Sequence, residues 1–140
     1  MAGGVRDQIV NLLLDTQALL WWRHGTKKLG ARARAAIARD ATDVRVSAAS
    51  AWEIAAKFYA GRLTLPAPAE AWMFAALDDS GFRPLVITVE HAVAAGALPQ
   101  VHGDPFDRML IAQAQIESLT IVTSDAVFDA YDVKVLDARR

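Results

Sequence analysis

Four acidic residues of this chain stand at positions where a charge is costly. Asp15 follows three leucines directly, and Glu53 lies between two apolar residues. Asp125 comes two residues after the expected strand 119–123, and Asp107 lies near the start of an expected helix. Isolated buried carboxylates are unfavourable, and carboxylates gathered together repel one another, so each would need a cation. Oxygen ligands of this kind suit a hard divalent ion, Mg²⁺ or Mn²⁺.

The composition leaves few other chemistries. The chain of 140 residues has no cysteine, which excludes disulfides, cysteine-ligated zinc, iron–sulfur clusters and a thiolate nucleophile. The three histidines, His24, His91 and His102, show no metal-ligand spacing, and we expect them at surface or loop positions. Of these, His102 alone comes close in sequence to Asp104 and Asp107. The sequence therefore favours a metal site built from carboxylates.

Glu53 and Asp15 differ in how well a purely structural role would explain them. Ser50 and Glu53 have the spacing of a capping box, in which Glu53 would bond back to the Ser50 amide. Asp15 fits a structural interpretation least, because a strand at the expected sheet centre runs straight into the charge. Both interpretations of Glu53 stay open at this point.

The remaining acids can also be explained by helix capping. Asp104 before Pro105 is typical of an N-cap followed by proline at the first helical position. Asp107 is explained as an acid of the first helical turn, which the helix dipole favours, and Asp125 as the cap of a turn after its strand. One shared site accounts for Asp15, Glu53, Asp107 and Asp125 together more simply than four separate caps.

Strands and helices alternate along the chain. We expect strands at 9–14, 44–46, 85–89, 119–123 and 133–136, and helices at 18–22, 27–39, 51–60, 69–77, 91–98 and 105–117. Most of the strands are apolar throughout, which is typical of a parallel sheet covered on both faces. The sequence therefore predicts an α/β fold, a three-layer α/β/α sandwich with a central, mainly parallel sheet. In such folds a ligand site lies at the carboxyl ends of the strands.

The length predicts one domain over residues 1–140, with residues 1–8 as a flexible N-terminal extension. We expect a cytoplasmic protein without a membrane segment, because no uninterrupted apolar run approaches the length of a spanning helix. The net charge of −1 hides an uneven distribution, since residues 1–70 hold 10 basic and 6 acidic residues and residues 71–140 hold 5 and 10. A near-neutral total is therefore weak evidence against a nucleic-acid partner.

Four segments of the chain, each carrying one of the four acids, resemble a known family. They are residues 12–22, 46–54, 102–114 and 121–125, and the third contains the run Asp-Pro-Phe-Asp-Arg. In this order they resemble the PIN-domain family, and within it the VapC-like toxins of bacterial type II toxin–antitoxin systems. One departure is Gln17, where this subgroup often has histidine.

The resemblance implies a PIN-like fold and a Mg²⁺- or Mn²⁺-dependent endoribonuclease that hydrolyses RNA phosphodiester bonds. It also implies a homodimer, and a cognate antitoxin that inserts near the acidic site. The residues implied as metal ligands and catalytic groups are Asp15, Glu53, Asp107 and Asp125.

Four neighbouring residues are expected to support these acids. Thr16 or Ser124 would hydrogen-bond a ligand carboxylate or a phosphate oxygen, and Arg108 would contact phosphate. The resemblance favours Asp107 as the metal ligand, with Asp104 as the helix cap or an outer partner.

Two other functions stay open from the sequence. A phosphatase of the haloacid-dehalogenase type also opens with an apolar strand ending in Asp, but Gln17 stands where its second Asp belongs. A catalytically silent PIN-like interaction module would keep its acids for structure alone, and it would bind no Mn²⁺ at millimolar metal.

Overall fold

The computed structural model describes residues 10–40 and 42–140, so the expected extension at 1–8 lies outside the described residues. Within them, five strands form one parallel sheet in the order β3-β2-β1-β4-β5. The strands are β1 (Asn11–Leu14), β2 (Asp43–Ser47), β3 (Arg83–Leu85), β4 (Thr120–Thr123) and β5 (Lys134–Asp137).

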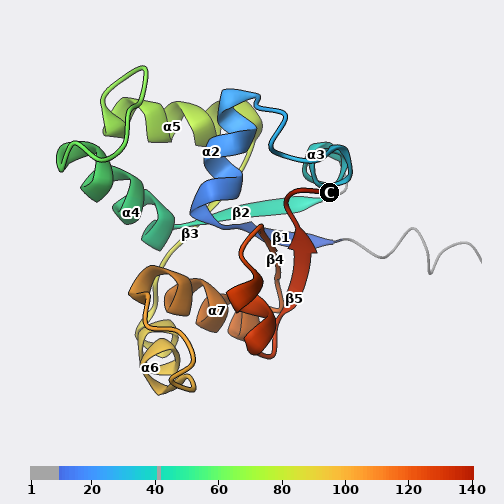
Figure 1. Cartoon of the computed structure of the whole chain (residues 1–140), viewed down its shortest axis with the longest axis vertical. Helices are drawn as coiled ribbons and strands as arrows, with labels where there is room; N and C mark the ends of the chain where they lie inside the picture. Colours follow the sequence, from blue (N-terminus) through green and yellow to red (C-terminus); the bar gives the residue numbers. More distant parts are fainter. Residues whose placement is uncertain (1–9, 41) are drawn as a thin grey trace, which may run out of the picture.

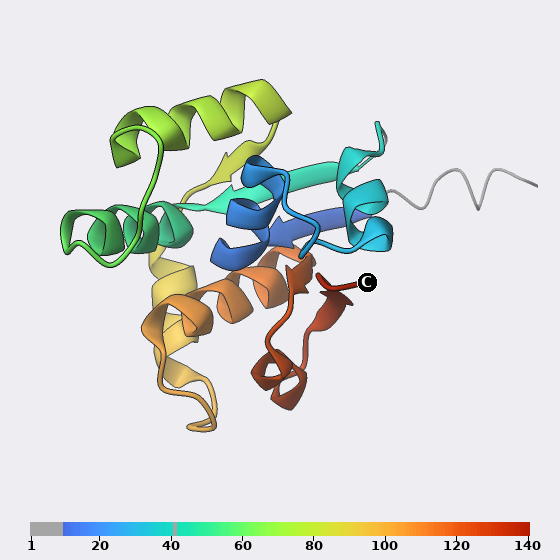
Figure 2. The same ribbon diagram turned by 45° about the horizontal axis from the view of Figure 1, so that its top comes forward.

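Helices cover both faces of this sheet. In the described part of the chain they are α2 (Thr16–His24), α3 (Ala31–Ala38), α4 (Ala48–Tyr59), α5 (Ala69–Ser80), α6 (Val89–Ala97), α7 (Pro105–Glu117) and the 3₁₀ helix η1 (Ala126–Ala130). Helices α2, α3 and α5 lie on one side of the sheet, and α6 and α7 lie on the other (Figures 1 and 2). The predicted α/β/α sandwich with a parallel sheet is confirmed. None of these helices is long and apolar enough to cross a membrane.

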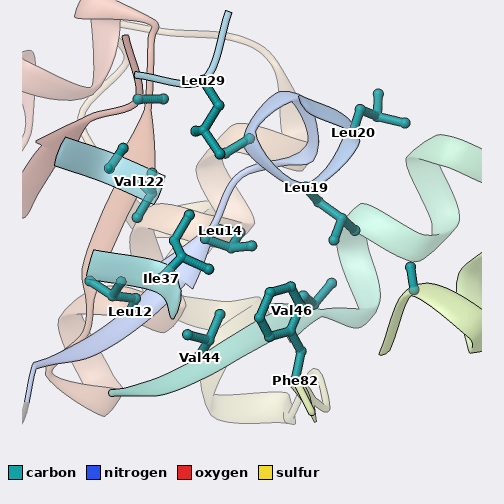
Figure 3. Packing of buried hydrophobic residues seen from close by; sticks show 14 of the residues in the cluster. Leu12, Leu14, Leu19, Leu20, Leu29, Ile37, Val44, Val46, Phe82 and Val122 are labelled. Carbon is teal, nitrogen blue, oxygen red and sulfur yellow. The ribbon is translucent and has the colours of Figure 1, made fainter. Parts of the chain in front are cut away.

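The central strand β1 is buried on both faces, which explains its continuous apolar sequence. Leu12 and Leu14 belong to one core cluster with Ile37 of α3, and Figure 3 shows this packing. Leu13 belongs to a second cluster with Ile111 of α7. Successive residues of a strand point to opposite faces, so a strand between two helical layers must be apolar at every position.

The strand predicted at 85–89 is wrong. The pairing of β3 with β2 ends at Leu85, and α6 begins at Val89. A capping box starts this helix, because Thr88 Oγ1 accepts from His91 N and Thr88 N donates to His91 Nδ1, both at 3.1 Å. This local cap overrides the β-propensity of the branched residues. His91 is itself buried, contrary to the expected surface or loop position.

Four helices begin at other residues than expected. Helix α2 begins at Thr16 rather than at residue 18, and α6 begins at Val89 rather than at residue 91. Helix α3 begins at Ala31 rather than at Lys27, because Gly30 N donates to Ala138 O at 2.8 Å and residues 27–29 form a turn. Helix α4 begins at Ala48 rather than at residue 51, because the Ser47 hydroxyl caps it.

Strands β1 and β4 are neighbours at the centre of the sheet, and the chain connections run to opposite sides of the sheet from this point. From β1 the chain continues to β2 on one side, whereas β4 and β5 lie on the other. In open α/β sheets, ligands bind in the crevice outside the carboxyl ends of the strands at such a point. Asp15 follows β1 directly, and Asp125 follows β4 after one residue.

Candidate metal centre

A cavity of about 410 Å³ opens at the carboxyl ends of β1 and β4. We call it the acidic cavity, because five carboxylates line it: Asp15, Glu53, Asp104, Asp107 and Asp125. The predicted supporting residues Thr16 and Ser124 also line it, as does Gln17. The structure thus brings the four acids proposed from the sequence into one cavity, although they come from four different parts of the chain.

Asp15 joins the end of β1 to the start of α2. Its backbone N donates to Val122 O at 3.0 Å, and its Oδ1 accepts from Ala18 N at 2.7 Å, which makes it the N-cap of α2. The Thr123 hydroxyl also bonds the carboxylate. Only 7% of the residue is exposed. Asp15 therefore caps a helix, the interpretation that its sequence position favoured least, and at the same time faces the acidic cavity.

Burial and mutual repulsion raise the pKa of two of the acids. Burial raises the pKa of Asp15 to about 6, and the charges of Asp107 and Glu53 add to the rise. Burial also raises the pKa of Asp107, and Asp104 and Glu53 add to it, whereas a hydrogen bond with His102 opposes it. A cation in the acidic cavity would relieve this repulsion, so the donor set fits a divalent metal ion.

Glu53 forms no capping box with Ser50. It lies in the second turn of α4, whose cap is Ser47, and the buried Ser50 Oγ has no hydrogen-bond partner among the described residues. Glu53 Oε1 instead accepts from Thr16 Oγ1 and Oε2 accepts from Lys57 Nζ, both at 2.6 Å. The capping-box interpretation is therefore wrong, because the carboxylate bonds across to α2 and along its own helix.

The tightest group of metal-ligating side chains in the described part of the chain is His102, Asp104 and Asp107. One ligand atom from each lies within 4.8 Å of the others. Asp104 Oδ1 accepts from the backbone N of Phe106 and Asp107, so it caps α7 as predicted. Asp107 Oδ2 lies 2.8 Å from His102 Nε2. In the sequence, the only indication of a role for His102 was its closeness to these acids. The loop position expected for it does not predict the contact with Asp107.

Thr123 is a site residue that sequence reasoning missed. Its hydroxyl accepts from Asp125 N at 3.1 Å and also bonds the Asp15 carboxylate, so one side chain joins the acids after β4 and β1. Asp125 Oδ1 accepts from Val127 N at 3.0 Å and caps η1, as its structural interpretation predicted. A hydroxyl can donate and accept together. The available signal was a hydroxyl residue at the carboxyl end of the expected strand 119–123.

Arg108 does not line the acidic cavity, and the expectation that it contacts phosphate is corrected. Its side chain is buried, and its two terminal nitrogens donate to backbone carbonyls at 2.9 to 3.3 Å. The acceptors are Ala95, Gly96, Leu98, Pro99 and His102. Because these carbonyls occupy the guanidinium, Arg108 holds the connection between α6 and α7 in place.

The raised pKa of Asp15 predicts how the metal-free protein responds to pH. The folded state binds this proton more tightly than the unfolded state, whose pKa is 3.8, so the free energy of unfolding falls as pH rises from about 4 to about 7. The loss is about 3 kcal/mol at most. We expect Asp15→Asn to remove this part of the pH dependence, and urea unfolding in EDTA at several pH values measures it. The same pH profile in both proteins would contradict the assignment.

Comparison with known proteins identifies related sequences and folds. Residues 12–134 match the family model of the PIN domain. FitAcB from Neisseria gonorrhoeae has a TM-score of 0.64 at 23% identity, covering 91% of this chain and 97% of that one. A toxin–antitoxin complex from Klebsiella pneumoniae gives 0.64 at 19% identity, with 91% and 97% covered. VapBC2 from Rickettsia felis, bound to a DNA fragment from their promoter, gives 0.63 at 14% identity, with 91% and 98% covered. At these identities the likeness shows a shared fold. No curated protein matches the sequence.

Proposed function

The chain belongs to the PIN domain family, and from this premise we propose that it is a metal-dependent endoribonuclease, the toxin of a type II toxin–antitoxin pair. The observation that carries the proposal is the acidic cavity, in which four parts of the chain contribute carboxylates at one sheet edge. Membership of this family leaves no reason to retain the phosphatase alternative. The silent interaction module remains the alternative that the experiment below tests.

We propose Mg²⁺ or Mn²⁺ as the cofactor, held by Asp15, Glu53, Asp107 and Asp125. The support is the donor chemistry, because oxygen ligands suit hard divalent ions and the charges of Asp107 and Glu53 already oppose ionisation of Asp15. When bound, such an ion supplies a Lewis acid that makes water nucleophilic near neutral pH and offsets charge on the phosphate. No nucleophilic side chain is then required.

The chain's own residues orient the carboxylates. Thr16 holds one oxygen of Glu53, and the Thr123 hydroxyl bonds Asp15. His102 lies against Asp107 Oδ2, and Ser124 lines the cavity as a candidate contact for a phosphate oxygen. Groups that fix ligand carboxylates in advance reduce the reorganisation needed during the reaction.

Exposed aromatic side chains on the helix that carries Glu53 support a protein partner. Trp52 is 66% exposed and Tyr59 is 71% exposed, and both lie on α4, which also carries Glu53. Aromatic residues are enriched at protein interfaces, and exposed apolar patches mark such sites. We propose that the cognate antitoxin covers this face of α4 and so blocks the acidic cavity.

A second apolar surface supports the proposed homodimer. Val86, Val89 and Val93 are exposed where the chain leaves β3 and forms α6. This surface lies on the side of the sheet away from α2, α3 and α5 (Figure 1). We also propose a cytoplasmic location, because the proposed RNA substrate and antitoxin are cytoplasmic molecules.

Metal-dependent cleavage of RNA by the purified chain tests the proposal. We expect RNA cleavage with Mg²⁺ or Mn²⁺ to be about 100-fold faster than in EDTA, and Mn²⁺ added after EDTA to restore it. An Asp107→Asn protein purified in the same way controls for contaminating nucleases. Absence of cleavage with both metals, together with no Mn²⁺ binding by calorimetry, would support the silent interaction module instead.

A further inference from the structure

Two cationic side chains, Lys57 and Arg62, line the acidic cavity among its five carboxylates. Lys57 lies one helical turn after Glu53 on α4, and its Nζ is 2.6 Å from Glu53 Oε2. Arg62 forms no ion pair with a carboxylate of the described residues, although its backbone N donates to Lys57 O at 2.8 Å. The cavity thus holds one cation that is bound to a proposed metal ligand and one that is not.

The ion pair between Lys57 and Glu53 is asymmetric in burial. The Glu53 side chain is 11% exposed, whereas that of Lys57 is 46% exposed. Thr16 holds the other oxygen of Glu53, so the carboxylate is fixed from the α2 side. A lysine ammonium has three donors on a flexible stem, and Glu53 occupies one of them. The Lys57 end is therefore the part of the pair that can move toward solvent.

A metal ion and the Lys57 ammonium would compete for the same carboxylate. Both are cations, and Oε2 is the oxygen of Glu53 to which Lys57 donates. A divalent ion in the acidic cavity would weaken the ion pair by repulsion and by taking the negative charge of Glu53. The released ammonium, on a side chain that is already 46% exposed, would be free to contact a phosphate bound at the acidic cavity.

We propose that Lys57 is a mobile counter-ion, which pairs with Glu53 before the metal binds and contacts a phosphate of the RNA backbone afterwards. This inference rests on the proposed function, because it assumes a metal ion and an RNA substrate. It gives Lys57 the phosphate contact that the sequence suggested for Arg108, whose guanidinium is occupied by backbone carbonyls. In this role Lys57 lowers the affinity for the metal ion and raises the affinity for RNA.

Metal binding without RNA tests the first half of the proposal. We expect Lys57→Gln to bind Mn²⁺ about 3- to 10-fold more tightly than the unchanged protein, measured by calorimetry. Arg62→Gln removes the same charge from the same cavity without touching Glu53, and we expect its Mn²⁺ affinity to change less than about twofold. Lys57→Arg keeps the charge and should not bind Mn²⁺ more tightly. Thermal unfolding of each variant checks that the half-exposed position tolerates the change.

The salt dependence of RNA cleavage tests the second half. One phosphate contact to a single strand contributes about −0.7 to the slope of log affinity against log salt. We expect Lys57→Gln to make the slope of log(kcat/KM) shallower by about 0.7 and to raise KM about 5- to 10-fold, with a smaller change in kcat. Lys134→Gln is the remote control, because Lys134 lies where β5 begins, at the opposite sheet edge.

Each outcome decides the proposal. An unchanged Mn²⁺ affinity or an unchanged salt slope in Lys57→Gln overturns it, and so does an equal gain in Mn²⁺ affinity in Arg62→Gln. The behaviour of the unchanged protein distinguishes failure of the Lys57 proposal from failure of the proposed function. If the unchanged protein neither binds Mn²⁺ nor cleaves RNA, the proposed function fails and the Lys57 proposal with it. If it does both while Lys57→Gln behaves identically, only the Lys57 proposal fails.

Discussion

We expect replacement of Asp15 by asparagine to lower the proposed metal-dependent RNA cleavage about 100- to 1000-fold and to leave the protein folded. Asparagine keeps the side-chain oxygen that accepts from Ala18 N, so the cap of α2 survives. It removes the charge that Asp15 would offer to a cation, and loss of one electrostatic interaction in an active site, as for an oxyanion-hole donor, costs about 2.7 to 4 kcal/mol of transition-state stabilisation. Initial rates of cleavage at saturating Mg²⁺ measure the effect.

The stability of the same variant supplies an internal check. Because burial and like charges raise the pKa of Asp15 to about 6, we expect metal-free Asp15→Asn to be more stable than the unchanged protein at neutral pH. An inactive variant that is more stable cannot owe its inactivity to unfolding. Asp129→Asn is the matched control, since Asp129 is an exposed acid of η1 outside the acidic cavity. Full cleavage by Asp15→Asn would show that the site is assigned wrongly.

Replacement of Arg108 by methionine has the largest expected effect on stability. The change removes the donors that serve five backbone carbonyls in the last turn of α6 and in its connection to α7, and it leaves those carbonyls without their partner. Breaking a buried charged network of this kind costs about 3 to 5 kcal/mol. Arg108→Lys should not restore it, because one ammonium cannot reproduce the planar fork of donors. Urea unfolding of both variants measures the loss.

An exposed arginine provides the comparison for Arg108. Arg83 is exposed and pairs with Asp43 at 3.2 Å, and we expect Arg83→Met to cost less than about 1 kcal/mol. If Arg108 contacted phosphate instead, Arg108→Met would keep the stability of the unchanged protein and lose affinity for RNA. A stability loss below that of Arg83→Met would therefore contradict the structural role.

A second side chain, that of Tyr131, also holds the connection between α6 and α7. Its contacts show how loss of Arg108 would affect the acidic cavity as well as stability. The Tyr131 hydroxyl accepts from His102 N at 2.9 Å and donates to Pro99 O at 3.0 Å. Arg108 bonds the carbonyls of the same two residues. Tyr131 and Arg108 together hold His102 against Asp107. We therefore expect loss of Arg108 to disturb the acidic cavity too.

The fold and the neighbourhood of the acids follow from short-range features of the sequence. The leucines of β1 predict a strand buried on both sides, and Asp15 directly after them predicts a polar group at the carboxyl edge. Asp104 before a proline predicts the cap of α7 without any knowledge of its surroundings. Each of these depends on neighbours within a few residues, so local rules suffice.

Other features depend on distant contacts or on local motifs that compete with residue propensity. The spacing of Ser50 and Glu53 suggested a capping box, yet Glu53 bonds Thr16, 37 residues away in the sequence. The branched residues after Leu85 suggested a strand, but the cap at Thr88 begins a helix instead. Here tertiary packing and a competing local motif outweighed residue propensity.

The sequence by itself determined the order of the elements, the parallel sheet and the sheet edge where the acids lie, because burial on both faces requires apolar strands and leaves polar groups for the strand ends. Only the tertiary structure decided which partner each polar group takes. Arg108 bonds backbone carbonyls, Thr16 bonds Glu53 from another helix, and Thr123 bonds two acids at once. A long side chain can reach several partners, and the packing of helices around the acidic cavity selects among them.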